Sequence, residues 1–268
     1  MLFTIITPSY NSGTFLEQTI QSVLSQQERG IEIQYIIVDG GSTDNTSEIL
    51  DKHSAAISSV IVEPDTGPAN AINKGLRLAS GDCVAWLNAD DVYFPGTLKR
   101  VWQTMEENPA ASFCFGSCPI IAEDGQEIRK EITRFKELFF PLSCRFTYQC
   151  INYISQPALF MRKSSVESAG FLREDMKAAW DYEFILRLWH AGPAKRIKAP
   201  PLSAFRWHEA SISGQHFRVQ FQEEYDAARQ DAGTWALQTM IHYFIHWGIV
   251  GSYSLMEKRR NGTPAGQN

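Results

Sequence analysis

Residues 83–91, Cys-Val-Ala-Trp-Leu-Asn-Ala-Asp-Asp, join a short apolar run directly to two adjacent carboxylates, Asp90 and Asp91. A short apolar run bounded by polar residues is typical of a buried strand. Neighbouring carboxylates repel each other, and a divalent cation at the strand end would offset their charge. Oxygen ligands suit Mg²⁺ or Mn²⁺ better than zinc. The alternative interpretation is that both aspartates only cap a helix that begins after Pro95-Gly96.

The first half of the chain alternates strand-like and helix-like segments. We expect strands at residues 2–7, 33–38, 60–62 and 83–87, and helices at residues 15–24, 46–52 and 69–79. Continuous apolar strands separated by amphipathic helices indicate a parallel sheet that is covered on both faces. The predicted fold class is therefore α/β.

Each predicted strand of this sheet ends in a polar cluster, at residues 7–11, 39–44, 63–67 and 88–91. Ligands of parallel sheets bind at the carboxyl ends of the strands, so we expect these four loops to converge on one rim. Ser9 and Asn11, facing Asp39, offer donors and acceptors for the edge of a base and the hydroxyls of a ribose. Pro8 would fix the backbone beside the base, and Tyr10 could pack against it. The pattern indicates a nucleotide.

The phosphates of such a nucleotide need charge neutralisation. A divalent ion held by Asp90 and Asp91 would bridge the carboxylates and a pyrophosphate. The two predicted sites therefore share one ligand. We interpret Asp44 or Ser42 instead as a cap of the helix that starts near Thr46.

The composition is that of a globular protein, with 268 residues, 44% hydrophobic and 21% charged. A net charge of −5 argues against nucleic acid as the main partner. The cysteines are odd in number and follow no tight metal-binding spacing, and no signal peptide precedes the first strand. We therefore expect reduced cysteines in a cytoplasmic protein, with Cys114 and Cys118 as small core residues.

The second half is less regular. We expect helices at residues 97–107, 164–169 and 182–191, strands at 112–117 and 156–161, and an irregular segment between residues 117 and 153. The tail, Trp235 to Met256, is aromatic-rich and is followed by Lys258-Arg259-Arg260, but its polar residues argue against a transmembrane helix. It is either an interfacial amphipathic helix or, as we favour, a helix packed on the core or on a dimer partner.

Four ordered motifs resemble family 2 glycosyltransferases, at residues 4–11, 36–44, 73–82 and 88–91. Weaker resemblance continues at residues 156–160, 170–171, 180–183 and 205–208. It implies a GT-A fold: a mostly parallel nucleotide-binding sheet flanked by helices, a mixed acceptor-side region and a helical C-terminus. The implied domains are residues 1–220, with a nucleotide-sugar half at 1–100 and an acceptor half at 101–220, and a helical extension at 221–268.

The resemblance also assigns the donor site. In that family, the position that matches Asp39 contacts the nucleobase, and those that match Asp90 and Asp91 contact ribose and metal. His208 matches a further metal ligand found in some members, although a loop histidine bonded to the backbone is an equal alternative. Asp65 matches a position near the nucleotide, but ordinary turn chemistry explains it equally well.

The catalytic base implied by the resemblance is Asp181, at the start of a predicted helix. The positive end of a helix favours an ionised carboxylate, and we expect a pKa near its ordinary value. Without the resemblance, a plain N-terminal helix carboxylate would be the favoured interpretation. Glu183 is the second choice for the base.

Three residues depart from the family pattern. Asn88 replaces an aspartate, Ile72 replaces an arginine that often contacts phosphate or base, and Trp180 replaces an acidic residue before the base. The stretch 203–207 lacks the glutamine of processive members, and their membrane spans are missing from the sequence. We therefore expect the addition of a single sugar.

The resemblance thus implies inverting, Mn²⁺- or Mg²⁺-dependent transfer of one sugar from a nucleotide-sugar, with a UDP-sugar favoured. The expected acceptor is a hydroxyl of a carbohydrate or lipid-linked molecule, in surface polysaccharide or glycolipid assembly, with peripheral contact at the inner face of the membrane. A catalytically silent nucleotide-sugar binder is one alternative. A nucleotidyltransferase is another, but residues 7–13 lack the basic side chains that its loop would need.

Overall fold

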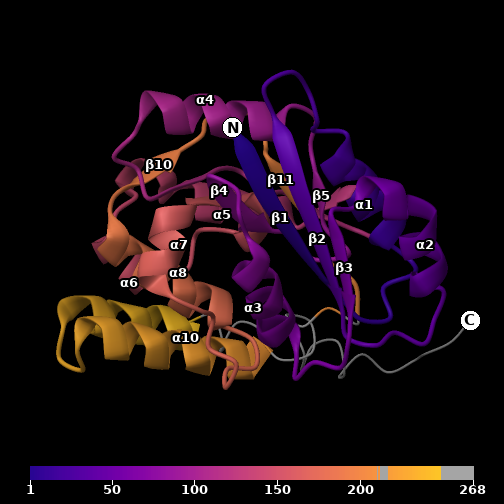
Figure 1. Ribbon diagram of the computed structural model, residues 1–268. Coiled ribbons are helices and arrows are strands. Elements are labelled where there is room, and N and C mark those ends of the chain that lie inside the picture. Colours follow the sequence, from indigo (N-terminus) through magenta and orange to yellow (C-terminus); the bar gives the residue numbers. More distant parts are fainter. Residues whose placement is uncertain (210, 212–216, 249–268) are drawn as a thin grey trace, which may run out of the picture.

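Two β-sheets and their covering helices make up the computed structural model, which describes residues 1–209, 211 and 217–248 (Figure 1). The larger sheet has the strand order β10-β6-β9-β4-β1-β2-β3. Its strands are β1 (Leu2–Ser9), β2 (Glu32–Asp39), β3 (Ser59–Val62), β4 (Cys83–Trp86), β6 (Phe113–Phe115), β9 (Leu159–Arg162) and β10 (Ala194–Arg196). The smaller sheet has the order β5-β11-β7-β8, with β5 (Val92–Tyr93), β7 (Ile120–Ile121), β8 (Glu127–Ile128) and β11 (Ser203–Arg206).

The predicted parallel half of the sheet is confirmed. β1 pairs in parallel with both β2 and β4, and β2 pairs in parallel with β3. The helices between them are α1 (Leu16–Leu24), α2 (Thr46–His53) and α3 (Pro68–Leu78). The polar ends of these four strands therefore lie on one rim, as expected from the sequence.

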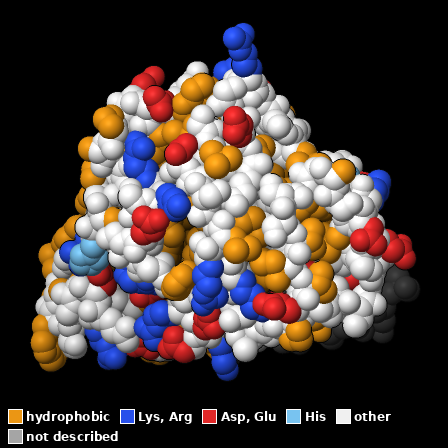
Figure 2. Space-filling view, in the orientation of Figure 1, with side chains coloured by type: hydrophobic (Ala, Val, Ile, Leu, Met, Phe, Trp, Pro, Cys, Tyr) orange, Lys and Arg blue, Asp and Glu red, His pale blue; other side chains and the backbone are white. Residues whose placement is uncertain are grey.

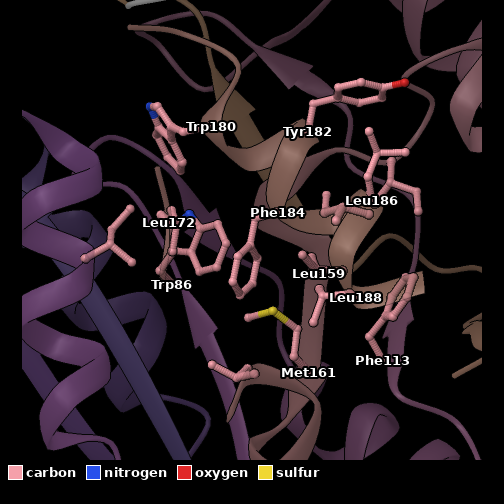
Figure 3. Close-up of a cluster of buried hydrophobic side chains, with 14 of the residues drawn as sticks. Trp86, Phe113, Leu159, Met161, Leu172, Trp180, Tyr182, Phe184, Leu186 and Leu188 are labelled. Carbon is pink, nitrogen blue, oxygen red and sulfur yellow. The ribbon is translucent and has the colours of Figure 1, made fainter. Parts of the chain in front are cut away.

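Both faces of the sheet are buried, which explains why its strands read as continuous apolar runs. Alternate residues of β1 enter different cores: Ile5 packs with α1, α2 and α4 (Thr97–Glu107), whereas Ile6 packs with α3 and α8 (Trp180–Ala191). Figure 3 shows part of the second core, where Trp86 of β4 meets Trp180 and Phe184 of α8. This contact anchors the helix that carries Asp181 to the centre of the sheet.

The second half of the larger sheet is mixed, because β9 runs antiparallel between β4 and β6. The strand predicted at residues 156–161 starts only at Leu159, after a 3₁₀ turn at Gln156–Ala158. Pro157 lacks the backbone N–H that a central strand position needs, which accounts for the later start. The strand predicted at residues 112–117 shortens to β6.

The segment between residues 117 and 153 contains more structure than predicted. It forms β7, β8, α5 (Lys130–Glu137), a 3₁₀ turn at Phe140–Leu142, and α6 (Arg145–Cys150). α5 has Arg129 at its N-cap, so it lacks the Ser, Thr, Asp or Asn that usually marks the start of a helix in a sequence. None of its residues is buried.

The C-terminal part contains α7 (Lys163–Ala169), α10 (Phe217–Ala232) and a helix at residues 237–248. α10 packs against α8 and α6, and it spans residue 220, where the sequence suggested a boundary. The two-part division remains a prediction. The tail beyond residue 248, including Lys258-Arg259-Arg260, lies outside the described residues.

All five cysteines are unpaired, and Cys114 and Cys118 are buried core residues, as predicted. Within the described ranges, we find no helix with the length and apolar character needed to cross a bilayer. Acidic and basic side chains intermingle over the lower part of the face in Figure 2, in keeping with the modest net charge.

Candidate functional site

A cavity of about 830 Å³ opens at the carboxyl ends of the central strands. Most of the residues predicted for the site line it: Pro8, Ser9, Tyr10, Asn11, Asp65, Asp90, Asp181 and His208. Asp39 and Asp91 are not among the lining residues. The predicted donor loops and the predicted base therefore line one cavity. The carboxylates of Asp39 and Asp91 lie outside its lining.

Asp39 holds the loop that follows β2. It is only 2% exposed, and its Oδ1 accepts the backbone N–H groups of Gly41 at 3.0 Å and Ser42 at 2.7 Å. Its Oδ2 accepts the Ser42 hydroxyl at 2.6 Å. Both carboxylate oxygens are engaged, so Asp39 in this conformation shapes the donor loop from behind.

Asn11 ties the loop after β1 to the loop after β2. Its backbone N–H donates to Ser42 Oγ at 2.7 Å, and its side-chain Oδ1 accepts the N–H of Thr43 at 2.9 Å. The residue has a φ of 48°, a left-handed conformation that asparagine tolerates better than most residues. The sequence therefore places asparagine where the backbone must turn and the side chain must bridge.

Three strand-end loops meet at Gly40. A Cβ atom at Gly40 would lie 2.6 Å from Oδ2 of Asp65 and 3.3 Å from Cδ2 of Tyr10, so a larger residue here would require these side chains to shift. Asp65 also accepts the N–H of Gly67 at 2.9 Å, so its predicted turn role is present. The Tyr10 ring is 64% exposed, whereas the Ser9 hydroxyl is buried and has no hydrogen-bond partner among the residues that the structure describes. This end of the cavity offers a free aromatic face and a free hydroxyl.

Asp44 bonds the start of α2 but is not its N-cap residue, which is Asn45. Oδ1 of Asp44 accepts the N–H of Thr46, the first residue of α2, at 3.0 Å, and its Oδ2 accepts the N–H of Gly13 at 2.9 Å. Ser42 does not cap this helix, because its hydroxyl donates to Asp39.

Asp90 and His208 lie side by side in the cavity wall. Oδ2 of Asp90 lies 2.9 Å from Nε2 of His208, and the hydrogen bond to this carboxylate raises the pKa of His208 above its usual value. The His208 ring also packs on Phe15, with ring centroids 5.4 Å apart. The histidine side chain therefore bonds a carboxylate rather than the backbone.

Asp91 points away from the cavity. Its side chain is fully buried: Oδ1 accepts the backbone N–H of Arg206 at 2.8 Å, and Oδ2 accepts Nδ2 of Asn88 at 3.3 Å. Burial, together with the charge of Asp90, raises its pKa well above the usual value. The helix-capping interpretation is wrong for both aspartates, because α4 has Gly96 at its N-cap and no side-chain cap.

We expect Asp91→Ala to destabilise the protein by about 1–3 kcal/mol, because the buried N–H of Arg206 would lose its acceptor. Urea denaturation of the variant and the wild type measures the difference. Asp51→Ala, which removes an exposed carboxylate from α2, is the control. Wild-type stability of Asp91→Ala would contradict this structural role.

Arg206 has a structural role that was not predicted from the sequence. Its guanidinium is buried and donates to the carbonyl of Asp90 through Nε at 2.9 Å, to the carbonyl of Glu123 through Nη1 at 2.8 Å, and to Gln18 through Nη2 at 2.9 Å. It also lies 4.7 Å from the centre of the Phe15 ring. Arg206 thus fixes the backbone on which Asp90 stands, and only its place within the weak motif at residues 205–208 hinted at this.

Asp181 lies in the first turn of α8, where its Oδ1 accepts the N–H of Tyr182 at 2.8 Å. Burial in the cavity wall raises its pKa to about 6, and the charge of Glu224 adds to the effect. The expectation of an ordinary pKa is therefore wrong, because the sequence could not reveal either cause. Glu183, the second choice, pairs with Arg187 at 2.7 Å and does not line the cavity.

The structure shows the surroundings of Ile72 and Trp180, two of the three residues that depart from the family pattern. Ile72 is fully buried in the core that α3 forms with the sheet, so this position makes no contact with a ligand. Trp180 packs on Trp86, with ring centroids 6.0 Å apart, and its ring nitrogen is buried without a partner. Asn88, the third of these residues, lines the cavity.

The end of the cavity around Asp181 contains residues that the sequence did not single out. Lys136 of α5 lines it and donates to Ser155 Oγ at 3.2 Å. Gln156 donates to the carbonyl of Trp86 at 2.7 Å, while its buried Oε1 has no partner within the described part of the chain. Asn152 and Gln220 complete this wall. The polar groups present here suit hydroxyl-bearing ligands.

A divalent metal fits the Asp90 and His208 pair. Among the described residues, no group of three His, Cys, Asp or Glu side chains could hold a metal by itself. Adjacent ligands of an ion with bonds of about 2.1 Å lie about 3 Å apart, which matches the 2.9 Å between these two atoms. Mg²⁺ commonly uses one or two protein ligands together with substrate phosphates and water. The donor set therefore suits an ion that arrives with a nucleotide.

Comparison with known proteins gives a consistent result. The family model described as glycosyl transferase family 2 matches residues 4–168. A putative teichuronic acid biosynthesis glycosyltransferase, TuaG of Bacillus subtilis, is 39% identical over 134 residues, which cover 49% of this chain and 52% of TuaG. The glycosyltransferase GlyG of Streptococcus pneumoniae is 33% identical over 112 residues, covering 41% of this chain and 36% of GlyG. The matches thus span about half or less of these curated relatives.

Solved structures share the fold at low sequence identity. TarS 1-349 of S. aureus, in complex with UDP-GlcNAc, has a TM-score of 0.69 at 20% identity, covering 87% of this chain and 66% of that one. The mannosyltransferase PcManGT of Pyrobaculum calidifontis, in complex with GDP-Man and Mn²⁺, has a TM-score of 0.65 at 18% identity, covering 91% of this chain and 69% of that one. Their likeness supports the GT-A architecture predicted from the sequence.

Proposed function

The chain belongs to glycosyl transferase family 2, and on that premise we propose that it transfers a single sugar, with inversion, from a nucleotide-sugar to a hydroxyl acceptor. The observation that carries the proposal is one cavity lined both by the Asp90 and His208 pair, 2.9 Å apart, and by Asp181. We assign the first pair to the donor and Asp181 to the acceptor. Such a site could hold a diphosphate and a base on opposite sides of a sugar.

At the donor end, the residues bind and orient. The exposed Tyr10 ring supports stacking of a nucleobase, and the unpartnered Ser9 hydroxyl supports a hydrogen bond to the nucleoside. Asp39 and Asn11 fix the loops that carry these groups. Asp90 and His208 would hold a Mn²⁺ or Mg²⁺ ion, which when bound neutralises charge that develops on the leaving diphosphate.

At the acceptor end, Asp181 would accept the proton of the attacking hydroxyl. A pKa of about 6 leaves it mostly ionised at pH 7 and makes it a stronger base than an ordinary aspartate. Direct attack on the anomeric carbon, opposite the departing nucleoside diphosphate, inverts the configuration. No covalent sugar–enzyme intermediate is required.

We favour a UDP-sugar donor and an acceptor in surface polysaccharide or glycolipid assembly. The UDP-GlcNAc bound in the TarS structure and the teichuronic acid pathway named for TuaG support this choice. The GDP-Man and Mn²⁺ of the PcManGT structure make GDP the second nucleotide to examine and support the metal.

Calorimetric titration with UDP and GDP, each in Mn²⁺ and then in EDTA, tests the donor site. We expect metal-dependent, micromolar binding of one nucleotide, followed by transfer from the matching sugar nucleotides. Absence of binding by either would overturn the donor assignment. Metal-dependent binding without transfer to any acceptor would instead indicate the silent nucleotide-sugar binder.

The helix at residues 237–248 buries polar side chains and exposes apolar ones. Its Thr239, His242 and His246 are buried, and His242 lies 2.9 Å from the carbonyl of Gln149. Its outer side exposes Leu237, Met240, Phe244 and Trp247, and hydrophobic side chains reach the surface over the C-terminal helices at the lower left of Figure 2. The helix therefore packs on the core, as we favoured, and presents an apolar face outward.

We propose that this outer face contacts the membrane that would carry a lipid-linked acceptor, on its cytoplasmic side. Aromatic side chains suit the headgroup region, and Lys258-Arg259-Arg260 follow in the sequence, where they can meet anionic lipid. A homodimer through the same face is the competing outcome.

Replacing both Phe244 and Trp247 by serine should weaken co-sedimentation with anionic vesicles by about tenfold or more, because these side chains are 74% and 56% exposed. Val62→Ser, which removes an exposed apolar residue from β3, is the control. Unchanged vesicle binding would sink the proposal, and a concentration-dependent change in mass instead would assign the face to a dimer.

A further inference from the structure

The segment at residues 172–179 leads directly into the helix that carries Asp181, and α3 holds its start. The backbone N–H of Leu172 donates to Oδ1 of Asn73 at 2.8 Å. In return, Nδ2 of Asn73 donates to the carbonyl of Leu172 at 2.9 Å and to Oε1 of Glu174 at 2.8 Å. Asn73 is only 1% exposed. The start of the segment is therefore fixed to a helix of the parallel half of the sheet.

A carboxylate of α10, Glu223, holds the end of the same segment. Its Oε1 accepts the N–H of Lys177 at 2.8 Å. Its Oε2 accepts the N–H groups of Ala178 at 2.9 Å and Ala179 at 3.0 Å. Successive backbone N–H groups form a concave site for an anion, and hydrogen bonds to a carboxylate are stronger than those between neutral groups. Glu223 thus fixes three consecutive residues.

Ala179 links this contact to Asp181. It is the N-cap residue of α8, and its methyl side chain cannot cap the helix. Its N–H is bonded to Glu223, and its carbonyl accepts the N–H of Glu183 at 3.1 Å, which closes the first turn of α8. Asp181 lies within this turn, and both Asp181 and Ala178 line the cavity. A shift of Ala179 would therefore move the Asp181 carboxylate and the wall beside it.

We propose that Glu223 is a positioning residue that fixes the backbone before α8 and thereby holds Asp181 where it can act on an acceptor hydroxyl. Glu223 does not line the cavity, so it acts through this backbone rather than on a ligand. Misplacing a reacting group by about 1 Å can lower a rate about 100-fold. The inference rests on the proposed function only for the role of Asp181 as the base.

The first test separates turnover from donor binding. Glu223→Ala removes all three bonds, so kcat for transfer should fall about 10- to 100-fold, while the dissociation constant of the nucleotide should stay within about twofold. Glu223→Gln keeps one accepting oxygen and should lose less than the alanine variant. Asp226→Asn is the control: it removes an acidic group one turn further along α10, where it pairs with Arg229 at 3.4 Å, and it should keep wild-type kcat.

Hydrogen–deuterium exchange of the whole protein gives a readout that does not depend on transfer. In Glu223→Ala, the amides of residues 177–179 should exchange at least about tenfold faster. The later turns of α8 should keep the wild-type rate, because Phe184 still packs on Trp86, with ring centroids 5.7 Å apart.

Faster exchange at residues 177–179 supports the role of Glu223 in holding this backbone even if the wild-type protein transfers no sugar, a result that would overturn only the proposed function. Wild-type exchange there would overturn the inference. A lower thermal midpoint with wild-type kcat would also overturn it, because Glu223 would then be a structural residue only. If Glu223→Ala fails to fold, Glu223→Gln carries the same measurements.

Discussion

Asp181→Asn should retain donor binding and lose sugar transfer by about 10²- to 10⁴-fold, the usual range for removal of a general base. The amide has nearly the same shape, so Oδ1 can still accept the N–H of Tyr182 and the start of α8 should be unchanged. The residue lines the cavity, and its burial raises its pKa to about 6. The measured quantities are kcat for transfer and the dissociation constant of the nucleotide.

The pH dependence gives an independent check of the same assignment. The ionised carboxylate is the active form, so wild-type kcat/KM should be constant above pH 7 and should fall about tenfold per pH unit well below 6. Asp181→Asn should lose this limb. Glu183→Gln is the matched control, because Glu183 is on the same helix but pairs with Arg187 away from the cavity. Wild-type turnover in Asp181→Asn would place the base elsewhere.

Asp90→Asn should remove the metal dependence of nucleotide binding and lower transfer by about 100-fold or more. The estimate assumes that a bound ion contributes about 3 kcal/mol to stabilising the leaving diphosphate. Asp90 is partly exposed, and among the described residues its carboxylate pairs with His208 alone, so the substitution should leave the thermal midpoint nearly unchanged. Calorimetry with Mn²⁺ and with EDTA measures the effect.

Asp91 provides a matched comparison that tests whether the effect is specific to Asp90. The two aspartates are adjacent in the sequence, but only Asp90 lines the cavity. Asp91→Ala should mainly lower stability, whereas Asp90→Asn should mainly lower metal-dependent binding. If Asp90→Asn still binds nucleotide more tightly in Mn²⁺ than in EDTA, to the wild-type extent, the ion is held by other residues.

The strands and helices of the first half could be predicted because they depend on local pattern. Both faces of the sheet are buried, so β1, β2 and β4 read as apolar runs, and the amphipathic helices between them read with a different period. α5 was not predicted, because Arg129 at its N-cap gives no helix-start signal and the helix buries no residue in the core. Lys136 of α5 was therefore not among the predicted site residues.

The site residues show the same contrast: some could be predicted from local pattern, and others depend on contacts between distant segments. Pro8, Ser9, Tyr10 and Asn11 were predictable, because the end of β1 necessarily lies on the rim where parallel strands end. The inward turn of Asp91 was not predictable, since it depends on the backbone N–H of Arg206, which is 115 residues away in the chain.

The sequence by itself determined the parallel half-sheet, the rim of polar loops and the family, because these follow from residue periodicity and from motifs in fixed order. Only the tertiary structure decided which carboxylates face the cavity and how strongly each holds a proton. Those properties depend on burial and on groups from distant segments: His208 beside Asp90, Arg206 beside Asp91, and the buried cavity wall around Asp181. Desolvation and Coulomb interactions act through space, so the order of residues along the chain does not encode them directly.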